Sequence, residues 1–273
     1  MTIRVRWIVT LVVAGLFALV AWRLFVHTGA LAKPALIVPS MNAHEALSPD
    51  LGARVDRLLN ERKEANRTDR PKLIALTFDD GPYPVFTPLL LAELRALHVP
   101  ATFFLIGRDA EQWPELTRRI RADGNEIADH TYSHPDLDEE TDAQVRAEIL
   151  KGRDTVWAIA PDPSLRTLMR PPHGRFNEGT IAVAQSLGYQ VVLWTDDSGD
   201  WRTLTADEIR HHLLAHATSP EIVLLHSGKL ATIEALPEVV ARFRAAGYRF
   251  VTAGDLIRQV PAESINHPAK GPV

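Results

Sequence analysis

Residues 73–81 read Leu-Ile-Ala-Leu-Thr-Phe-Asp-Asp-Gly, and a proline follows them. Six residues that suit a buried β-strand run directly into two aspartates, and the Gly-Pro pair then predicts a turn. An apolar run of this length is typical of a parallel strand that is covered on both faces. Because like charges repel, Asp79 and Asp80 need a cation or an arginine close by. The stretch therefore predicts a buried strand that ends in a polar site.

The alternation of a short apolar strand with a helix continues to residue 260. Strand-like runs cover 73–78, 101–106, 126–129, 167–170, 190–194, 222–226 and 249–252. Helix-like runs cover 86–98, 109–122, 141–159, 178–187, 205–217 and 234–246. Asp109 and Thr205 are the expected N-caps of two of these helices. This alternation predicts an α/β fold with a parallel sheet, either a small or incomplete (β/α) barrel or a doubly wound open sheet.

The composition is that of an ordinary globular protein and excludes several kinds of site. The 273 residues carry a formal net charge of −4, which offers no basic surface for nucleic acid. Cysteine is absent, so disulfides, iron–sulfur clusters, thiolate zinc sites and cysteine nucleophiles are excluded. Any bound metal ion must therefore have histidine, aspartate or glutamate ligands.

The N-terminus carries an apolar segment. Residues 7–22 contain no charge, Arg4 and Arg6 precede them, and Arg23 follows. The segment fits either a cleaved signal peptide or an uncleaved membrane anchor, and both predict export of the rest of the chain. We expect residues 1–32 to engage the membrane, and the protein to be periplasmic or anchored to the cytoplasmic membrane facing outward.

Three further parts of the chain follow this export segment. Residues 33–70 are expected to form a linker with one amphipathic helix, at about 48–66. Residues 71–260 are expected to form the α/β domain, and residues 261–273 are expected to form a flexible polar tail. The oligomeric state cannot be inferred from these patterns.

Polar clusters follow five of the predicted strands. They are Asp79-Asp80, His130-Thr-Tyr-Ser-His134, Arg170-Pro-Pro-His-Gly174, Asp197-Ser-Gly-Asp-Trp201 and His226-Ser-Gly228. Each cluster alone also has an ordinary explanation as turn, loop or core residues. In a parallel β/α fold, however, the C-terminal strand ends converge on one rim, where active sites lie. One carboxylate with two histidines also makes a three-ligand metal site with open positions.

A second group of histidines lies on a predicted helix. His212 and His216 have the four-residue spacing of a helical metal site, and His211 is adjacent to them. Asp207 and Glu208, one turn earlier, are the only carboxylates that the sequence places nearby. We interpret this group as a solvated helix face.

The five clusters resemble, in order and spacing, the motifs of the polysaccharide deacetylases, the NodB-homology domains of carbohydrate esterase family four. The matching segments are Thr77-Phe-Asp-Asp-Gly81, His130-Thr-Tyr-Ser-His134, Arg170-Pro-Pro-His-Gly174, Asp197-Ser-Gly-Asp-Trp201 and Leu224-Leu-His226. The resemblance covers about residues 70–257. It implies a distorted, incomplete (β/α) barrel with the catalytic domain at 71–260 and the active site at the C-terminal strand ends.

The resemblance also implies a metal centre. Asp80, His130 and His134 would bind one divalent ion, zinc above all, with cobalt, nickel or iron as alternatives. Asp79 would be the general base that takes a proton from an activated water. Arg170 would orient Asp79 and keep it ionised.

The remaining implied roles concern the leaving group and the glycan. His226 would be the general acid, and Asp200 would keep it cationic. Four residues would contact the substrate: Pro172, His173, Trp201 and Leu224. Two positions depart from the family pattern. His173 stands where an aromatic residue such as tyrosine is common, and Ser227 stands where aspartate is common and has no assigned role.

The function expected from this resemblance is metal-dependent removal of N-acetyl groups from glycans that contain N-acetylglucosamine. Peptidoglycan, chitin-like oligomers and poly-N-acetylglucosamine are all compatible substrates. An O-acetyl esterase of the xylan type could use the same site, and a glycan-binding protein could hold the metal without turnover. Two histidines and a carboxylate also suit a non-haem iron oxygenase, which the strand–helix alternation opposes.

Overall fold

The computed structural model describes residues 72–260, and each of the seven predicted strands has a counterpart there. The strands are β1 (Lys72–Asp79), β2 (Thr102–Leu105), β3 (Glu126–Asp129), β4 (Leu168–Met169), β5 (Gln190–Val191), β6 (Asp196–Asp197), β7 (Glu221–His226) and β8 (Tyr248–Phe250). The helices are α3 (Phe86–Ala96), α4 (Gly107–Gln112), α5 (Pro114–Ala122), α6 (Asp142–Ile159), α7 (Glu178–Ser186), α8 (Ala206–Ala215), α9 (Leu230–Ala245) and α10 (Ala253–Gln259). Two short 3₁₀ turns are η1 (Pro163–Arg166) and η2 (Pro172–Gly174). Strand β6 is not predicted from the sequence, because two residues are too short to show a period.

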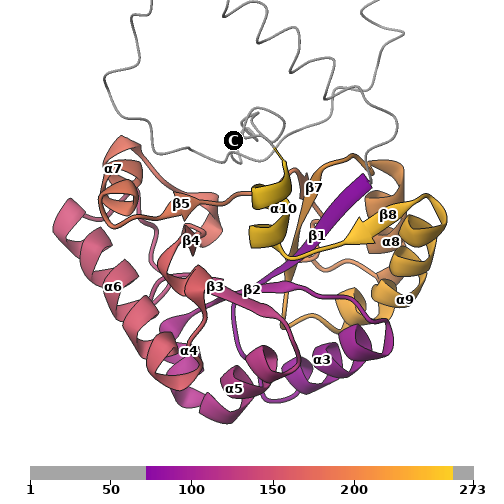
Figure 1. Ribbon diagram of the computed structural model, residues 1–273, viewed down its shortest axis with the longest axis horizontal. Coiled ribbons are helices and arrows are strands. Elements are labelled where there is room, and N and C mark those ends of the chain that lie inside the picture. Colours follow the sequence, from indigo (N-terminus) through magenta and orange to yellow (C-terminus); the bar gives the residue numbers. More distant parts are fainter. Residues whose placement is uncertain (1–71, 261–273) are drawn as a thin grey trace, which may run out of the picture. The chain divides into compact units, whose positions relative to one another are not determined.

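The strands form one parallel sheet in the order β5-β4-β3-β2-β1-β7-β6, and β8 pairs with β1 as well. The sheet curls, and helices α3, α5, α6, α8 and α9 lie around its outer face (Figure 1). β1 is central because it pairs with β7 along most of its length, with β2 at its last three residues and with β8 at its first three. The expected incomplete barrel is confirmed, and the doubly wound alternative is wrong.

The residues of β1 alternate between two apolar cores, because neighbouring side chains of a strand point to opposite faces. Ile74 and Leu76 belong to the core that packs under the outer helices. Leu73 and Ala75 belong to the core inside the curl. Asp79 continues the second set, which places it on the inner face at the C-terminal end of the strand.

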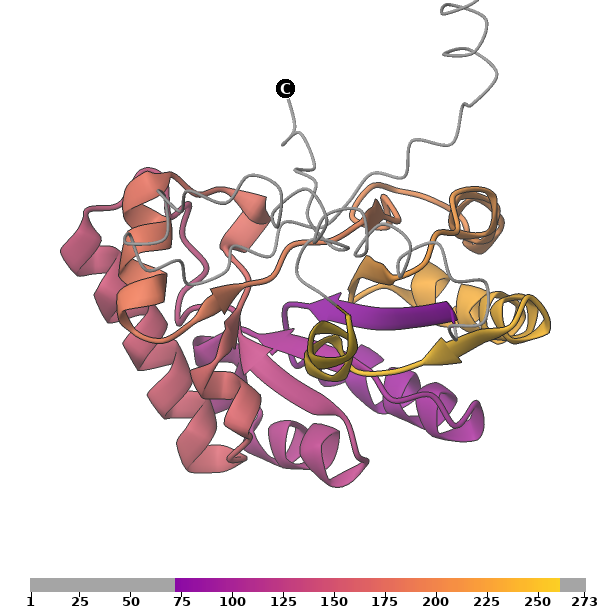
Figure 2. The same ribbon diagram turned by 45° about the horizontal axis from the view of Figure 1, so that its top comes forward.

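Helix α10 covers the inner face at the opposite ends of the strands (Figure 2). The backbone amide of Ala253 donates to the Thr102 hydroxyl at 2.8 Å, and that of Gly254 donates to the Glu126 carboxylate at 2.9 Å. These acceptors are the first residues of β2 and β3. Leu256 packs in the inner apolar core. The N-terminal end of the inner face is therefore filled by α10, and the predicted site residues lie at the C-terminal end.

The predicted helix 109–122 is wrong in one respect, because the structure divides it into α4 and α5. The break falls at Trp113, directly before Pro114, and a residue before proline is driven out of the helical conformation. α4 begins at Gly107, so Asp109 lies in its first turn and is not its N-cap.

Other helix ends follow the sequence more closely. Thr205 is confirmed as the N-cap of α8, where it forms a reciprocal capping box with Glu208. α9 begins at Leu230, earlier than the expected start at residue 234. α10 is not among the predicted helices, because a helix this short leaves little periodicity to detect.

The predicted export segment, linker and tail at residues 1–32, 33–70 and 261–273 lie outside the described residues. Within residues 72–260, no helix combines the length and the apolar character needed to cross a membrane.

Candidate active site

The predicted site residues follow the C-terminal ends of several strands, on one rim of the curled sheet. Asp79 ends β1 and pairs in register with His226, which ends β7. His130 directly follows β3, and Arg170 directly follows β4. Because parallel strands in register end at the same level, residues far apart in the chain meet here.

Asp80, His130 and His134 lie close enough to bind one metal ion. One ligand atom from each lies within 4.8 Å of the others, and no other such trio occurs within residues 72–260. Asp80 Oδ1 is 3.8 Å from His130 Nε2 and 3.4 Å from His134 Nε2. These donors suit a divalent ion, because carboxylate and imidazole are ligands of zinc and its neighbours in the first transition row.

The hydrogen bond of His130 Nδ1 leaves the lone pair of its Nε2 available to a metal ion. Nδ1 lies 2.8 Å from the Arg170 carbonyl oxygen. A carbonyl only accepts, so Nδ1 carries the proton and Nε2 keeps its lone pair toward Asp80 and His134. Burial, with a contribution from the charge of His134, lowers the pKa of His130 to about 3. Neutral imidazole is the form that binds metal ions.

Two of these three residues have an unusual backbone conformation. The φ angles of Asp80 and His134 are 70° and 65°, in the left-handed region that residues with a side chain rarely adopt. Such conformations cluster at functional sites and need support from their surroundings. At Asp80 the turn breaks the alternation of the strand, so Asp79 and Asp80 both approach His130 Nε2, at 3.7 and 3.8 Å.

Ser227 supports the backbone of both aspartates. Its hydroxyl lies 3.2 Å from the Asp79 carbonyl oxygen and 3.1 Å from that of Asp80, and its amide donates to Asp79 at 3.0 Å. The structure therefore supplies contacts for a residue to which the sequence assigned no role. Its position directly after His226 is the only signal in the sequence that marks it.

Arg170 holds the Asp79 carboxylate from inside the barrel. The guanidinium is fully buried and donates to Asp79 Oδ1 at 2.6 Å and to the Thr77 hydroxyl at 2.9 Å. Its other nitrogens donate to the backbone carbonyls of Val192 and Leu193, both at 3.0 Å. Burial raises the pKa of the Asp79 carboxyl, and the charge of Arg170 offsets only part of that rise. Asp79 is thus fixed in orientation and disposed to accept a proton.

His226 is paired with a buried carboxylate. Its Nδ1 lies 2.7 Å from Asp200 Oδ1, and its backbone amide donates to Asp200 Oδ2 at 2.8 Å. The Thr232 hydroxyl donates to the same Oδ2 at 2.6 Å. Burial alone lowers the pKa of His226, but the hydrogen bond of Asp200 and the charge of Asp79 outweigh it, and the pKa is raised. The protonated form of His226 is therefore favoured.

Trp201 and Leu224 occupy different settings. The Trp201 side chain is half exposed, and its Nε1 donates to Asp197 Oδ1 at 3.3 Å. The Arg202 guanidinium lies 4.7 Å from the centre of the Trp201 ring. Leu224 is buried within β7, on the same face of the strand as His226 by the two-residue period.

His173 contacts the ring of His134, and Pro172, in the same turn η2, is buried. The rings of His173 and His134 meet edge to face, with their centres 4.5 Å apart. His173 Nδ1 lies 2.6 Å from Asp136 Oδ1, and Arg175 donates to the other oxygen of Asp136 at 2.6 Å. Asp136 and Arg175 were not expected from the sequence, because neither belongs to a strand-end motif.

Two of the helical histidines contact one another, and one of them contacts a carboxylate of β6. His212 Nε2 lies 2.7 Å from Asp196 Oδ1, and the rings of His212 and His216 lie 4.4 Å apart. Asp196 is buried and belongs to β6, whereas His212 is partly exposed, so the expectation of a solvated face holds only in part for His212. His211 and His216 are exposed, as expected.

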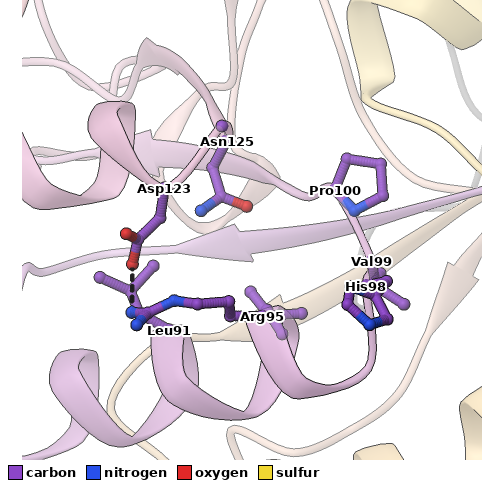
Figure 3. Close-up of a pocket in the computed structure, with 9 residues that line it drawn as sticks. Leu91, Arg95, His98, Val99, Pro100, Asp123 and Asn125 are labelled. Carbon is purple, nitrogen blue, oxygen red and sulfur yellow. Dashed lines mark hydrogen bonds and ion pairs between the residues drawn. The ribbon is translucent and has the colours of Figure 1, made fainter.

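A cavity of about 190 Å³ lies away from these residues, between the ends of α3 and α5 (Figure 3). Leu91 and Val99 line it, and an ion pair of 2.8 Å between Arg95 and Asp123 crosses one side. It lies near the N-terminal ends of β2 and β3, opposite the cluster of site residues. It therefore plays no part in the site.

Comparison with known proteins gives the same assignment as the geometry. The model of the polysaccharide deacetylase family matches residues 66–192. The chain is 37% identical over 192 residues to a peptidoglycan-N-acetylglucosamine deacetylase of Bacillus cereus, covering 68% of this chain and 89% of that protein. It is 36% identical over 189 residues to a chitooligosaccharide deacetylase of Sinorhizobium fredii, covering 69% and 84% of the two chains.

Similarity to solved structures supports the fold as well. The structure of the peptidoglycan deacetylase PdaC from Bacillus subtilis superposes with a TM-score of 0.64 at 30% sequence identity. The match covers 69% of this chain and 91% of the chain in that structure. An incomplete parallel barrel, a strand-end site and relatives of this similarity lead to one conclusion: the chain belongs to the polysaccharide deacetylase family.

Proposed function

We propose that this protein is a metal-dependent deacetylase that removes N-acetyl groups from the N-acetylglucosamine residues of a cell-envelope glycan. The observation that carries the proposal is the arrangement of Asp80, His130 and His134 beside two charged pairs, Asp79 with Arg170 and His226 with Asp200. The names of the relatives support amide hydrolysis on peptidoglycan or chitooligosaccharides.

A divalent ion bound by the three ligands supplies Lewis acidity, which lowers the pKa of a water molecule and polarises an acetyl carbonyl. Zinc suits this donor set, and cobalt, nickel or iron can replace it. The neutral state of His130 and the free Nε2 described above fit this assignment.

Asp79 is the proposed general base. Its Oδ1 is bound to Arg170, whereas its Oδ2 lies 3.7 Å from His130 Nε2 and so faces the metal ligands. That free oxygen accepts the proton of the attacking water, while Arg170 prevents the carboxylate from rotating away.

His226 is the proposed general acid. Its Nδ1 is occupied by Asp200, which leaves Nε2 to donate a proton to the nitrogen of the leaving glucosamine. Base and acid thus have separate partners, which allows both proton transfers at one pH.

The glycan contacts are proposed from the rim. The exposed Trp201 ring offers an apolar face on which a sugar ring can stack. Leu224 and Pro172 are buried and suit contact with a group as small as an acetyl methyl. His173 lies beside His134 and offers its Nε2 to a sugar hydroxyl.

The proposed setting of the reaction is outside the cytoplasm. The uncharged segment at residues 7–22 supports export, by either a cleaved signal or a membrane anchor. The relatives' peptidoglycan substrates are consistent with that setting.

The test is acetate release by the purified full-length chain in detergent, stripped of metal and then supplied with zinc or cobalt. N-acetylglucosamine oligomers and peptidoglycan are the expected substrates, and acetylated xylan tests the ester alternative. We expect release that depends on metal and is lost in Asp79→Asn. Preferred release from xylan would favour the esterase, and metal and glycan binding without any release would favour a binding protein. Activity that survives both chelation and Asp79→Asn would refute the proposal.

A further inference from the structure

The loop between the two histidine ligands, residues 131–133, is held in an unusual conformation. The φ angle of Thr131 is 66°, and that of His134 just beyond the loop is 65°. His130 is anchored separately by its hydrogen bond to the Arg170 carbonyl. The position of His134 relative to His130 therefore depends on what holds this loop.

Most of the polar backbone groups of the loop have a partner outside it. The Thr131 amide donates to Asp129 Oδ1 at 2.8 Å, and the Thr131 carbonyl accepts from the Gly107 amide at 2.9 Å. The Tyr132 carbonyl accepts from the Arg108 amide at 2.9 Å. These bonds leave the amides of residues 132 and 133 to be satisfied.

A single carboxylate on α6, that of Glu148, accepts from both of these amides. Glu148 Oε2 lies 3.1 Å from the Tyr132 amide nitrogen and 2.8 Å from that of Ser133. Glu148 Oε1 accepts from the Ser133 hydroxyl at 2.9 Å. The carboxylate thus binds three donors between the two ligands, and none of the family motifs includes it.

The neighbouring turn of α6 is shaped for close contact with the same loop. A Cβ at Gly152 would lie 2.6 Å from the Thr131 carbonyl carbon and 2.9 Å from Asp129 Oδ1. Residues 148 and 152 are four apart, so they share one face of the helix. α6 therefore approaches the loop closely at Gly152 and binds it through Glu148.

We propose that Glu148 is a positioning residue of the metal site, which fixes the loop so that His134 is held at binding distance from Asp80 and His130. The proposal rests on the proposed function. A bound ion needs nitrogen ligands at about 2.0–2.1 Å, so small drifts of one ligand weaken binding. Groups that orient metal ligands typically contribute about 10–100-fold to metal affinity.

Zinc binding to the metal-stripped full-length chain tests the proposal by titration calorimetry. Glu148→Ala should weaken the affinity about 10–100-fold. Glu148→Gln should bind like wild type, because its amide oxygen accepts from both backbone amides and its nitrogen donates to Ser133. Asp154→Ala is the matched control, since it removes an exposed acid from the same helix and should leave the affinity unchanged.

Hydrogen exchange gives a second readout that does not depend on turnover. In Glu148→Ala the amides of Tyr132 and Ser133 should exchange faster than in wild type, while amides of β1 stay protected. If Glu148→Ala does not fold, Glu148→Asp takes its place in both measurements. It keeps the charge but is shorter by one methylene, so zinc affinity and loop protection should both fall.

Three results would overturn the inference. The first is a Glu148→Ala protein with wild-type zinc affinity and wild-type loop protection, and the second is a Glu148→Asp protein with both of these properties, if Glu148→Ala does not fold. The third is a Glu148→Gln protein that binds zinc as weakly as Glu148→Ala does. The last would show that charge, and not hydrogen bonding, matters. A wild-type chain that binds zinc but releases no acetate would refute the proposed function and leave the role of Glu148 standing. A wild-type chain without zinc affinity would refute both.

Discussion

Asp79 and Asp80 show how neighbouring residues of one type acquire different roles. Asp79 ends a regular strand, is almost fully buried and binds Arg170. Asp80 has a left-handed backbone, remains partly exposed and faces both histidines. In a regular strand the two carboxylates would point to opposite faces, so the left-handed turn is what brings both to one site.

The pairing of His226 with Asp200 predicts a change in pH dependence. Asp200→Asn removes the negative charge beside His226 and weakens the hydrogen bond that raises the pKa of His226, so that pKa falls. As the proposed acid, His226 must be protonated, and activity is lost as pH rises through its pKa. The alkaline limb of the kcat/KM profile should therefore move to lower pH.

Thr232→Val is the control for this prediction. It removes another hydrogen bond to Asp200 but keeps the carboxylate charge, so the alkaline limb should stay close to that of wild type. An Asp200→Asn profile with an unmoved alkaline limb would show that His226 is not the acid.

At the scale of secondary structure, α6 matters for more than covering the sheet. Its buried Val145, Ile149 and Val156 pack in the apolar cores. Glu148 and Gly152 face the loop at residues 131–133. The helix thus links core packing to the geometry of the proposed metal ligands.

Gly152→Ala should destabilise the protein, although alanine is the better helix former. The new Cβ would meet backbone atoms of Thr131, so α6 or the loop must shift. Overpacking of this kind typically costs about 1–3 kcal/mol. Thermal or denaturant unfolding of the variant and the wild type measures the change.

Ala147→Gly, at an exposed position of the same helix, is the control. It measures how much the difference in helix propensity between alanine and glycine alone changes the free energy of unfolding, which is about 1 kcal/mol. A Gly152→Ala protein that is as stable as wild type, or more stable, would contradict the close approach of α6 to the loop.

On the scale of the whole molecule, strand β7 carries titratable groups at both ends. His226 lies in the site, and Glu221 lies at the opposite end with no exposed surface. Among residues 72–260, Glu221 Oε1 has no hydrogen-bond partner, and Oε2 accepts only from the Thr218 amide. Burial, with a contribution from the charge of Asp196, raises the pKa of Glu221 to about 8.

This raised pKa predicts that stability falls as pH rises from about 4.5 to about 8. Between these two pH values the Glu221 carboxyl keeps its proton in the folded protein but releases it in the unfolded chain. Above about pH 8 the carboxyl is ionised in both states, and the loss of stability is complete. Glu221→Gln cannot ionise and escapes the loss. Each unit of pKa difference corresponds to about 1.4 kcal/mol, so the variant should be more stable than wild type at pH 9, on the order of a few kcal/mol.

Melting temperatures at pH 5 and pH 9 test this expectation. The difference in melting temperature between Glu221→Gln and wild type should be larger at pH 9 than at pH 5. Glu234→Gln, which changes an exposed acid of α9, should differ from wild type by the same amount at both pH values. An equal difference for Glu221→Gln at pH 5 and pH 9 would show that Glu221 is ionised in the folded protein.

Local patterns in the sequence were enough to predict seven of the eight strands and the strand-end positions of the candidate site residues. They succeed because burial imposes a two-residue period or a continuous apolar run on a strand, and because motifs such as His130-Thr-Tyr-Ser-His134 are contiguous. Short elements such as β6 and α10 were missed, since a few residues carry too little periodicity.

Only the tertiary structure decided which side chains support the site. Glu148 meets the loop at residues 131–133, and Ser227 meets the carbonyls of both aspartates. Away from the site, the partly exposed His212 lies beside the buried Asp196. None of these contacts follows from the spacing of residues along the chain. They arise where separate elements pack together, and the curling of the sheet, which the local sequence does not encode, determines which residues come within hydrogen-bonding distance.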